Sequence, residues 1–288
     1  MASSDIIVVV NWGKIGDTIH AMIAAQKLSQ AYRQQVYLYI HTPCVWLGSL
    51  VDHIAWIDDW QFTDQYGPRA FESLSEKIIA SIKKDFNKNV SRVVNLSHYQ
   101  PGKELPNQWR ISDWWVNGFH SMDFNAACAG VQQLVGGERV LDIRDLPQPS
   151  SDHVLLLPNC GDMGQRGWPR RNWDSLVHNI GGDMIQCGGG DVVLGGVKDC
   201  RCYSLWEVVC AMRKARLIIS LDTMASANLA ESVGTPIVRI HRGMCKASST
   251  GPGISDWKGH EWVKDQGFNN SASVNDVMQC VGRLWDWK

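Results

Sequence analysis

The chain has 288 residues, of which 44 % are hydrophobic and 20 % are charged, and its formal net charge at pH 7 is −1. This composition can form sizeable cores but contains no run of the roughly 18 apolar residues that a membrane span needs, which excludes a disordered chain, a coiled coil and a membrane-spanning protein. Both halves are nearly neutral, so the chain lacks the basic excess that proteins use to neutralise a nucleic-acid backbone.

The first half of the chain alternates predicted strands with predicted helices. The β-branched run from Ile6 to Val10 is typical of a buried parallel strand, and the turn after it leads into a helix from about Asp17 to Tyr32. Further elements are predicted as strands at Val36 to Ile40, Ile54 to Ile57 and Val90 to Leu96, and as a helix at Ala70 to Lys84. From Ser97 to Gly118 the periodicity is lost, which indicates a long functional loop or an irregular helix.

The second half repeats this alternation after a break. The stretch from Asp142 to Asp152 is rich in Pro, Ser and Asp, and it predicts a linker between two domains. The strands predicted after it are Val154 to Leu157, Met184 to Cys187, Leu217 to Leu221 and Pro236 to Ile240. The predicted helices are Asn172 to Asn179, Ser204 to Lys214, Ser226 to Val233 and Val274 to Trp287.

The two series of elements predict an α/β protein with two Rossmann-like domains, at residues 1–148 and 149–288. Each domain would hold about 140 residues, which is an ordinary domain size. Ligands of open parallel sheets bind outside the carboxyl ends of the strands. We therefore expect the two domains to face each other across a cleft that binds the ligands.

Common cofactor and metal motifs do not match. Gly13 and Gly16 form only GxxG after the first strand, so the GxGxxG dinucleotide fingerprint fails, and the segment GDVVLGGVK misplaces the lysine of a phosphate-binding P-loop. Cys200 and Cys202 form CxC without a second pair, which disfavours a zinc site, and the nine irregularly spaced cysteines disfavour a disulfide framework. The N-terminus lacks the pattern of a signal peptide, which predicts a cytoplasmic protein.

Three segments carry a resemblance to a known family. They read NWGKIGDTIHAMIAAQKL, LPNCGDMGQRGWPRRNWDSLV and SLWEVVCAMRKARLIISLDTMASANLAESVGTPIVRI in chain order. The first is similar to the opening strand and Gly-Asp turn of glycosyltransferase family 9, the heptosyltransferase-like enzymes. The second and third resemble that family's K-x-W-P segment and its D-T-G, H-L-A-A, G-x-P element. The resemblance implies the GT-B fold, with an acceptor-binding N-terminal domain and a nucleotide-sugar-binding C-terminal domain that ends in a closing helix.

Asp17 is the candidate catalytic residue. It follows the first strand, and the resemblance implies that its carboxylate accepts a proton from an acceptor hydroxyl that attacks the anomeric carbon of a sugar. The alternative is an aspartate that only caps a helix, because an acid near a helix N-terminus is favoured by capping and by the helix dipole.

The resemblance also implies a donor site that holds the diphosphate of a nucleotide sugar. Arg166 stands in the place of the family's lysine before Trp-Pro, where a guanidinium would bind the leaving diphosphate in bidentate fashion. Asp222 and Thr223 end a strand and open a helix, whose first N–H groups attract phosphate. The predicted donor residues are Gly16, Arg166, Arg170, Gly188, Gly189, Glu207, Asp222, Thr223, Met224 and Asn228.

Each part of this donor site has a structural alternative. Met224 and Asn228 stand where the family has glycine and histidine, so the loop must differ in shape. The Asp222 turn could be a capped helix, and the glycines could be a simple turn. Arg166, Arg170 and Arg171 could form a solvated basic turn, and Glu207 could be a first-turn helix acid.

Aromatic and basic residues gather in the irregular part of the first half. Flat rings there could stack on an acceptor sugar or base, although most tryptophans pack in cores. The candidate acceptor residues are His98, Trp109, Arg110, Trp114, Trp115 and His120.

Together these features predict a metal-independent glycosyltransferase without a resident cofactor, which uses a nucleotide-diphosphate sugar as co-substrate. The resemblance favours a lipopolysaccharide-type glycan as the acceptor. One alternative is transfer to a modified base of DNA, which would require a local basic surface such as Arg239, Arg242 and Lys246. Another alternative is a non-catalytic nucleotide or sugar sensor on the same fold, which the departures at Met224 and Asn228 favour and Asp17 and Arg166 disfavour.

Overall fold

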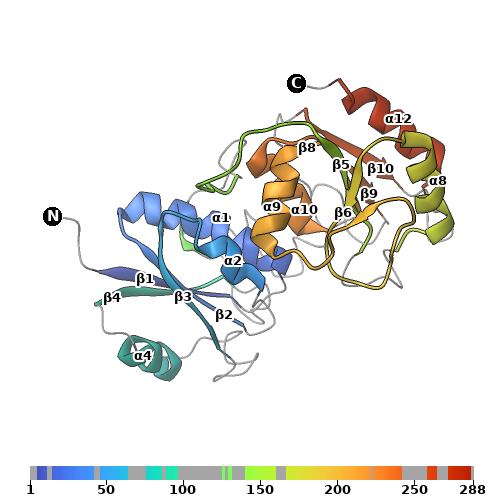
Figure 1. Ribbon diagram of the computed structural model, residues 1–288. Coiled ribbons are helices and arrows are strands. Elements are labelled where there is room, and N and C mark those ends of the chain that lie inside the picture. Colours follow the sequence, from blue (N-terminus) through green and yellow to red (C-terminus); the bar gives the residue numbers. More distant parts are fainter. Residues whose placement is uncertain are drawn as a thin grey trace. The chain divides into compact units, whose positions relative to one another are not determined.

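The computed structural model describes residues 5–11, 15–41, 46–63, 76–85, 89–96, 125–126, 129–131, 140–159, 167–221, 223–241, 258–264 and 272–286. These residues form two compact units, one within Met1–Arg144 and the other within Asp145–Ala247 and Asp256–Lys288. Each unit has a parallel sheet with helices packed on it (Figure 1), which confirms the predicted α/β fold class. No helix in the described part of the chain is long and apolar enough to cross a membrane.

The first unit is built around the strand β1 (Ile6–Asn11). All residues of β1 are buried, as its β-branched sequence predicts for a strand that is covered on both faces. The strands lie in the order β3-β2-β1-β4, and every pair is parallel. The other elements of this unit are α1 (Ile15–Tyr32), β2 (Val36–His41), α2 (Gly48–Val51), β3 (Ile57–Thr63), α4 (Glu76–Asp85) and β4 (Val90–Asn95).

The strand predicted at Ile54 to Ile57 is wrong, because β3 begins only at Ile57. Ile54 belongs to the turn after α2, where its N–H donates to the Val51 carbonyl at 2.9 Å. The Ile54 side chain is buried in the first unit, so an apolar residue is favoured there although the position is not in a strand. The short helix α2 was not predicted, and its Gly48 is covered by the Trp60 ring, which a Cβ atom would approach to 2.5 Å.

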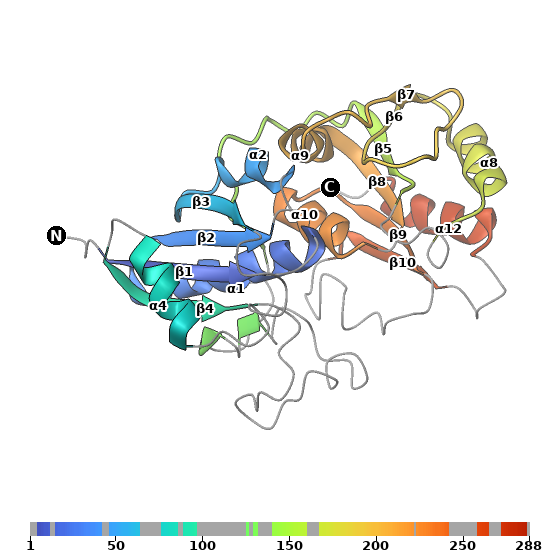
Figure 2. The same cartoon turned by 90° about the horizontal axis from the view of Figure 1, so that it is seen from below.

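The second unit has six described strands in the order β10-β9-β8-β5-β6-β7, and all pairs are parallel. The helices α8 and α12 contribute to the apolar core on one face of this sheet, and α9 and α10 lie on the other face (Figure 2). The elements are β5 (His153–Leu157), α8 (Arg170–Ile180), β6 (Met184–Gln186), β7 (Lys198–Asp199), α9 (Leu205–Lys214), β8 (Ala215–Leu221), α10 (Met224–Val233), β9 (Ile237–His241), β10 (His260–Lys264) and α12 (Val274–Leu284). The edge strands β7 and β10 were not predicted, because β7 has only two residues and β10, with the sequence HEWVK, is mostly polar.

The segment that joins the units is fastened at each end to its own unit. In the first unit, the Arg144 N–H donates to the His53 carbonyl at 2.8 Å. In the second, the Asp152 N–H donates to the Lys214 carbonyl at 3.1 Å. Asp145, which follows the last residue of the first unit, has a φ of 60°, a conformation that non-glycine residues seldom adopt. The stretch predicted as a linker therefore contains the boundary between the two units.

His153 at the start of β5 makes the stability of the second unit sensitive to pH. Burial lowers its pKa below the usual 6.5, and this outweighs the opposing effect of its hydrogen bond to the Ala211 backbone. Within the described part of the chain, its buried Nε2 has no hydrogen-bond partner. As the pH falls through 6.5, the unfolded chain takes up a proton at this position before the folded chain does, so folding stability falls with pH. We expect His153→Gln to flatten the decline in the free energy of unfolding between pH 7 and pH 5, as measured by urea titration, and an unchanged slope would contradict this role.

Candidate functional site

In the first unit, Asn11, the last residue of β1, connects the end of this strand to β4 and to α1. Asn11 is 1 % exposed, and its Nδ2 donates to the Leu96 carbonyl at 2.8 Å, just beyond the end of the neighbouring strand β4. The Thr18 hydroxyl donates to the Asn11 Oδ1 at 2.9 Å, which connects the start of α1 to the end of β1. Sequence reasoning missed both residues, although a polar residue that ends a fully apolar strand is a usable signal.

Asp17 lies between these anchored positions, as the third residue of α1. It is partly buried, and Gly16 precedes it in the same turn. Asp17 lies inside the first helical turn and not at the N-cap. If its role is only to stabilise the helix, it therefore acts through the helix dipole and not as a capping side chain. Asp17 is thus placed at the carboxyl end of the central strand of its sheet by the bonds of Asn11 and Thr18.

In the second unit, α10 begins close to the carboxyl end of β8, a central strand of the sheet. Thr223 is the N-cap of α10, and its hydroxyl accepts from the Ser226 N–H at 3.2 Å. The Ser226 hydroxyl lies 2.7 Å from that of Thr223 and 2.9 Å from that of the buried Ser220 in β8. These three hydroxyls connect the strand, the cap and the first helical turn. The N-terminus of α10, beginning at Met224, is therefore a fixed place where an anion is favoured.

Asn228 lies one turn further into α10 and is fully buried. Its backbone carbonyl accepts from the Ser232 hydroxyl at 2.7 Å. Asn228 is thus shielded from solvent, while Thr223 lies at the start of α10, at the carboxyl edge of the sheet.

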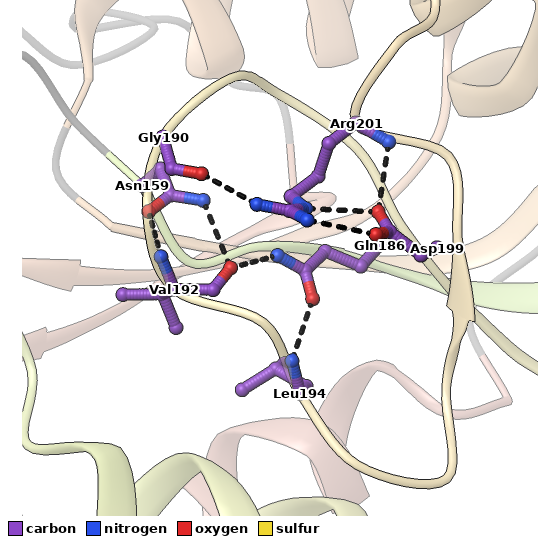
Figure 3. Close-up of polar contacts among 7 residues, drawn as sticks. All are labelled: Asn159, Gln186, Gly190, Val192, Leu194, Asp199 and Arg201. Carbon is purple, nitrogen blue, oxygen red and sulfur yellow. Dashed lines mark hydrogen bonds and ion pairs between the residues drawn. The ribbon is translucent and has the colours of Figure 1, made fainter.

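Gly188 and Gly189 follow the end of β6, at the same edge of the sheet. Gly188 and Gly190 have φ values of 81° and 129°, which only glycine adopts without strain. Because the strand order is β8-β5-β6, this glycine turn lies two strands away from the start of α10. Figure 3 shows the contacts that hold the segment after this turn.

Two other predicted donor residues are engaged within their own helices. Glu207 forms a capping box with Ser204, and the bond from the Ser204 backbone N–H at 2.7 Å lowers the pKa of its carboxyl group. Arg170 at the start of α8 pairs with Asp174 at 3.2 Å, and its side chain is 56 % exposed. These contacts agree with the alternatives of a first-turn acid and a solvated basic turn, since an exposed pair of this kind contributes little to stability.

The remaining predicted residues lie outside the described part of the chain. On the donor side these are Arg166 and Asp222, and on the acceptor side His98, Trp109, Arg110, Trp114, Trp115 and His120. Trp168, which follows Arg166 closely, is described and is buried. Its Nε1 donates to the Ala272 carbonyl at 2.7 Å, and its ring meets Trp173 edge to face at 5.0 Å between centroids. The Trp of the Trp-Pro pair therefore anchors the start of α8 to the segment before α12.

A basic surface at Arg239 is not present. Arg239 is fully buried in β9, which lies between β8 and β10, so it cannot contribute to the basic surface that the DNA alternative would require. Arg242 and Lys246 lie outside the described residues. Among the described residues, no three His, Cys, Asp or Glu side chains are grouped so that they could hold a metal ion.

No family model and no curated protein matches the chain, but solved structures match it over nearly its full length. A glycosyl transferase family 9 protein from Veillonella parvula has a TM-score of 0.69 at 15 % identity, covering 99 % of this chain and 98 % of that one. The Escherichia coli heptosyltransferase WaaC with ADP has a TM-score of 0.66 at 14 % identity, covering 97 % and 99 %. The E. coli ADP-heptose lps heptosyltransferase II has a TM-score of 0.67 at 12 % identity, covering 97 % and 98 %.

These comparisons show the fold. The chain has the GT-B architecture of the family 9 heptosyltransferases, and this confirms the fold that the three sequence segments implied.

Proposed function

We propose that the protein is a glycosyltransferase that moves a sugar from a nucleotide-diphosphate donor to a hydroxyl acceptor without a metal ion. The observation that carries this proposal is the Thr223-capped start of α10 at the carboxyl end of β8, within a fold shared over the full chain with heptosyltransferases. Such a helix start stabilises a diphosphate by its N–H groups and dipole, which is the role that a cation plays in other transferases. The residues of unit 1 would bind the acceptor, and those of unit 2 the donor.

The proposed reaction is the attack of an acceptor hydroxyl on the anomeric carbon of the donor sugar. An acceptor hydroxyl oxygen forms a bond to the anomeric carbon of the sugar, and the bond from that carbon to the diphosphate oxygen breaks. The proton of the hydroxyl moves to the Asp17 carboxylate, and the electron pair leaves with the diphosphate. Arg166 and the start of α10 stabilise the negative charge that develops on the leaving group.

A panel of nucleotide-diphosphate sugars tests this proposal before the acceptor is known. Glycosyltransferases transfer the sugar slowly to water, so we expect one member of the panel to be hydrolysed by the intact protein at a rate above background. A protein that binds a nucleotide sugar without hydrolysing it would be the non-catalytic sensor. Release of nucleoside diphosphate only in the presence of DNA that carries hydroxylated bases would support the DNA alternative.

We expect nucleoside diphosphate binding to be insensitive to chelation. Calorimetry of the intact protein at low salt should give the same dissociation constant, within about twofold, with and without EDTA, because the helix start and arginine replace the cation. The control is the same titration with added magnesium. Loss of binding in EDTA would contradict the metal-independent part of the proposal.

A further inference from the structure

Three side chains hold the crossover from β6 to β7, and none of them was predicted as functional. They are Asn159 after the end of β5, Gln186 at the end of β6 and Arg201 after the end of β7, and they converge on the segment after Gly188 (Figure 3). They come from the ends of three strands that are neighbours in the sheet. The crossover of residues 187–197 contains no described helix, and these side chains form hydrogen bonds with its backbone.

The amides of Asn159 and Gln186 bind the same stretch of backbone. The Val192 N–H donates to the Asn159 Oδ1 at 3.2 Å, and the Asn159 Nδ2 lies 3.5 Å from the Val192 carbonyl. The Gln186 Nε2 donates to this carbonyl at 2.5 Å, and its Oε1 accepts from the Leu194 N–H at 2.9 Å. Buried and partly buried peptide groups of this segment, which is not in a strand, are thereby hydrogen-bonded by side chains.

Arg201 holds the other side of the segment. Its guanidinium forms a two-pronged pair with Asp199, with both N···O distances at 2.9 Å, and its third nitrogen donates to the Gly190 carbonyl at 2.7 Å. Gly190 lies so close to Asn159 that a Cβ atom would come within 2.6 Å of its side chain. Arg201 therefore contacts the glycine turn at the Gly190 carbonyl, and Asn159 contacts it at the Gly190 Cα.

A buried amide at the position of Gln186 lowers folding stability relative to an apolar side chain, which indicates a role other than packing. Gln186 is fully buried, pairs with Leu156 of β5, and shares a sheet face with Met184, and both neighbours belong to the apolar core. A buried amide stabilises a fold less than an apolar side chain of similar volume unless its bonds are needed. The bonds of Gln186 are used to place the crossover.

We propose that Asn159, Gln186 and Arg201 are positioning residues that hold the Gly188–Gly190 turn as a preformed binding edge for the nucleoside of the donor. This inference rests on the proposed function. The turn lies two strands from the start of α10, which is ~10 Å along the sheet edge at the usual strand spacing. A nucleoside diphosphate is long enough to place its diphosphate at α10 and its nucleoside at this turn. A rigid turn binds more tightly because less conformational entropy is lost on binding.

The test compares two kinds of ligand that reach different parts of this edge. The probes are inorganic diphosphate, which is short enough to contact only the start of α10, and ADP, GDP and UDP, measured by calorimetry on the intact protein. We expect Gln186→Leu and Arg201→Lys to weaken the bound nucleoside diphosphate about tenfold, because they loosen the turn. The affinity for inorganic diphosphate should stay within about twofold of the original protein.

The chain offers a matched control in Arg283 of α12. It forms the same two-pronged pair, with Glu261 at 3.0 and 2.9 Å, and makes a third contact to the Cys280 Sγ. Arg283→Lys should change neither affinity. Hydrogen exchange at the Val192 and Leu194 amides supplies a second readout, which should become faster in Gln186→Leu and not in Arg283→Lys.

The outcomes separate the two proposals. A folded Gln186→Leu or Arg201→Lys protein with faster exchange and full nucleoside diphosphate affinity would overturn the positioning role and leave the proposed function intact. Equal weakening of both ligands would also overturn it, because it would indicate a merely structural role. Failure of the original protein to bind any of the four probes would overturn the proposed function and this inference with it. If Gln186→Leu does not fold, Arg201→Lys decides, since its side chain is already 27 % exposed.

Discussion

Asp17→Asn is expected to lower the sugar-transfer rate by about a hundredfold or more, which is the usual contribution of a positioned general base. Asn has nearly the shape of Asp, so the bond between Asn11 and Thr18 that places this turn should persist. The affinity for the nucleotide-sugar donor should remain nearly unchanged. The measurement is the turnover of the donor at saturation, with water as acceptor or with whichever acceptor proves active.

A matched variant separates the loss of the base from the loss of a charge at a helix start. Glu76 is the acidic residue in the first turn of α4, so Glu76→Gln removes the same kind of charge elsewhere in the first unit. Both substitutions should cost about 0.3 to 1 kcal/mol of stability through the helix dipole. Only Asp17→Asn should slow transfer. Turnover at the original rate in that variant would show that Asp17 is not the base and only stabilises the start of α1.

Trp168→Ala is expected to destabilise the protein by about 3 to 5 kcal/mol, because truncation of a buried tryptophan removes contacts and leaves a cavity. The Trp168 ring is 3 % exposed and packs edge to face on Trp173. Its indole N–H also supplies a hydrogen bond to the Ala272 carbonyl, which the variant leaves unsatisfied. The measurement is the free energy of unfolding from a urea titration.

Trp168→Phe is the matched control. It keeps an aromatic ring in the core and loses the bond to Ala272, so we expect a cost of about 1 to 3 kcal/mol. Nucleoside diphosphate affinity should be kept in the folded Trp168→Phe protein, because Trp168 points into the core between α8 and α12. A large loss of affinity at unchanged stability would instead make Trp168 a ligand-binding residue.

Part of the candidate site was predictable because its signals are local. Thr223 stands between a β-branched strand and a helix, and the structure makes it the N-cap of α10. Asp17 follows the first strand closely, and the structure places it in the first turn of α1. A strand, a turn residue and a helical period lie within one short stretch of sequence, so the sequence pattern was enough to find them.

Other parts of the site have no local signal. The capping box of Glu207 satisfies its own helix, and the burial of Asn228 depends on which face of α10 packs on the sheet. The apolar residue Ile54 looked like part of a strand because a buried turn and a strand both need apolar side chains. Arg239 is buried because β9 lies between β8 and β10, and no local sequence pattern predicts this strand order.

The sequence by itself determined the α/β class, the position of most strands and helices, and the GT-B fold that the full-length structural match confirms. Alternating buried and turn-forming residues encode these features at short range. Only the tertiary structure decided that Asn159, Gln186 and Arg201 act on one turn, because the strands assemble in the order β8-β5-β6-β7 and not in chain order. Parallel strands bring their carboxyl ends to one edge, so residues far apart in the chain meet there through sheet pairing alone.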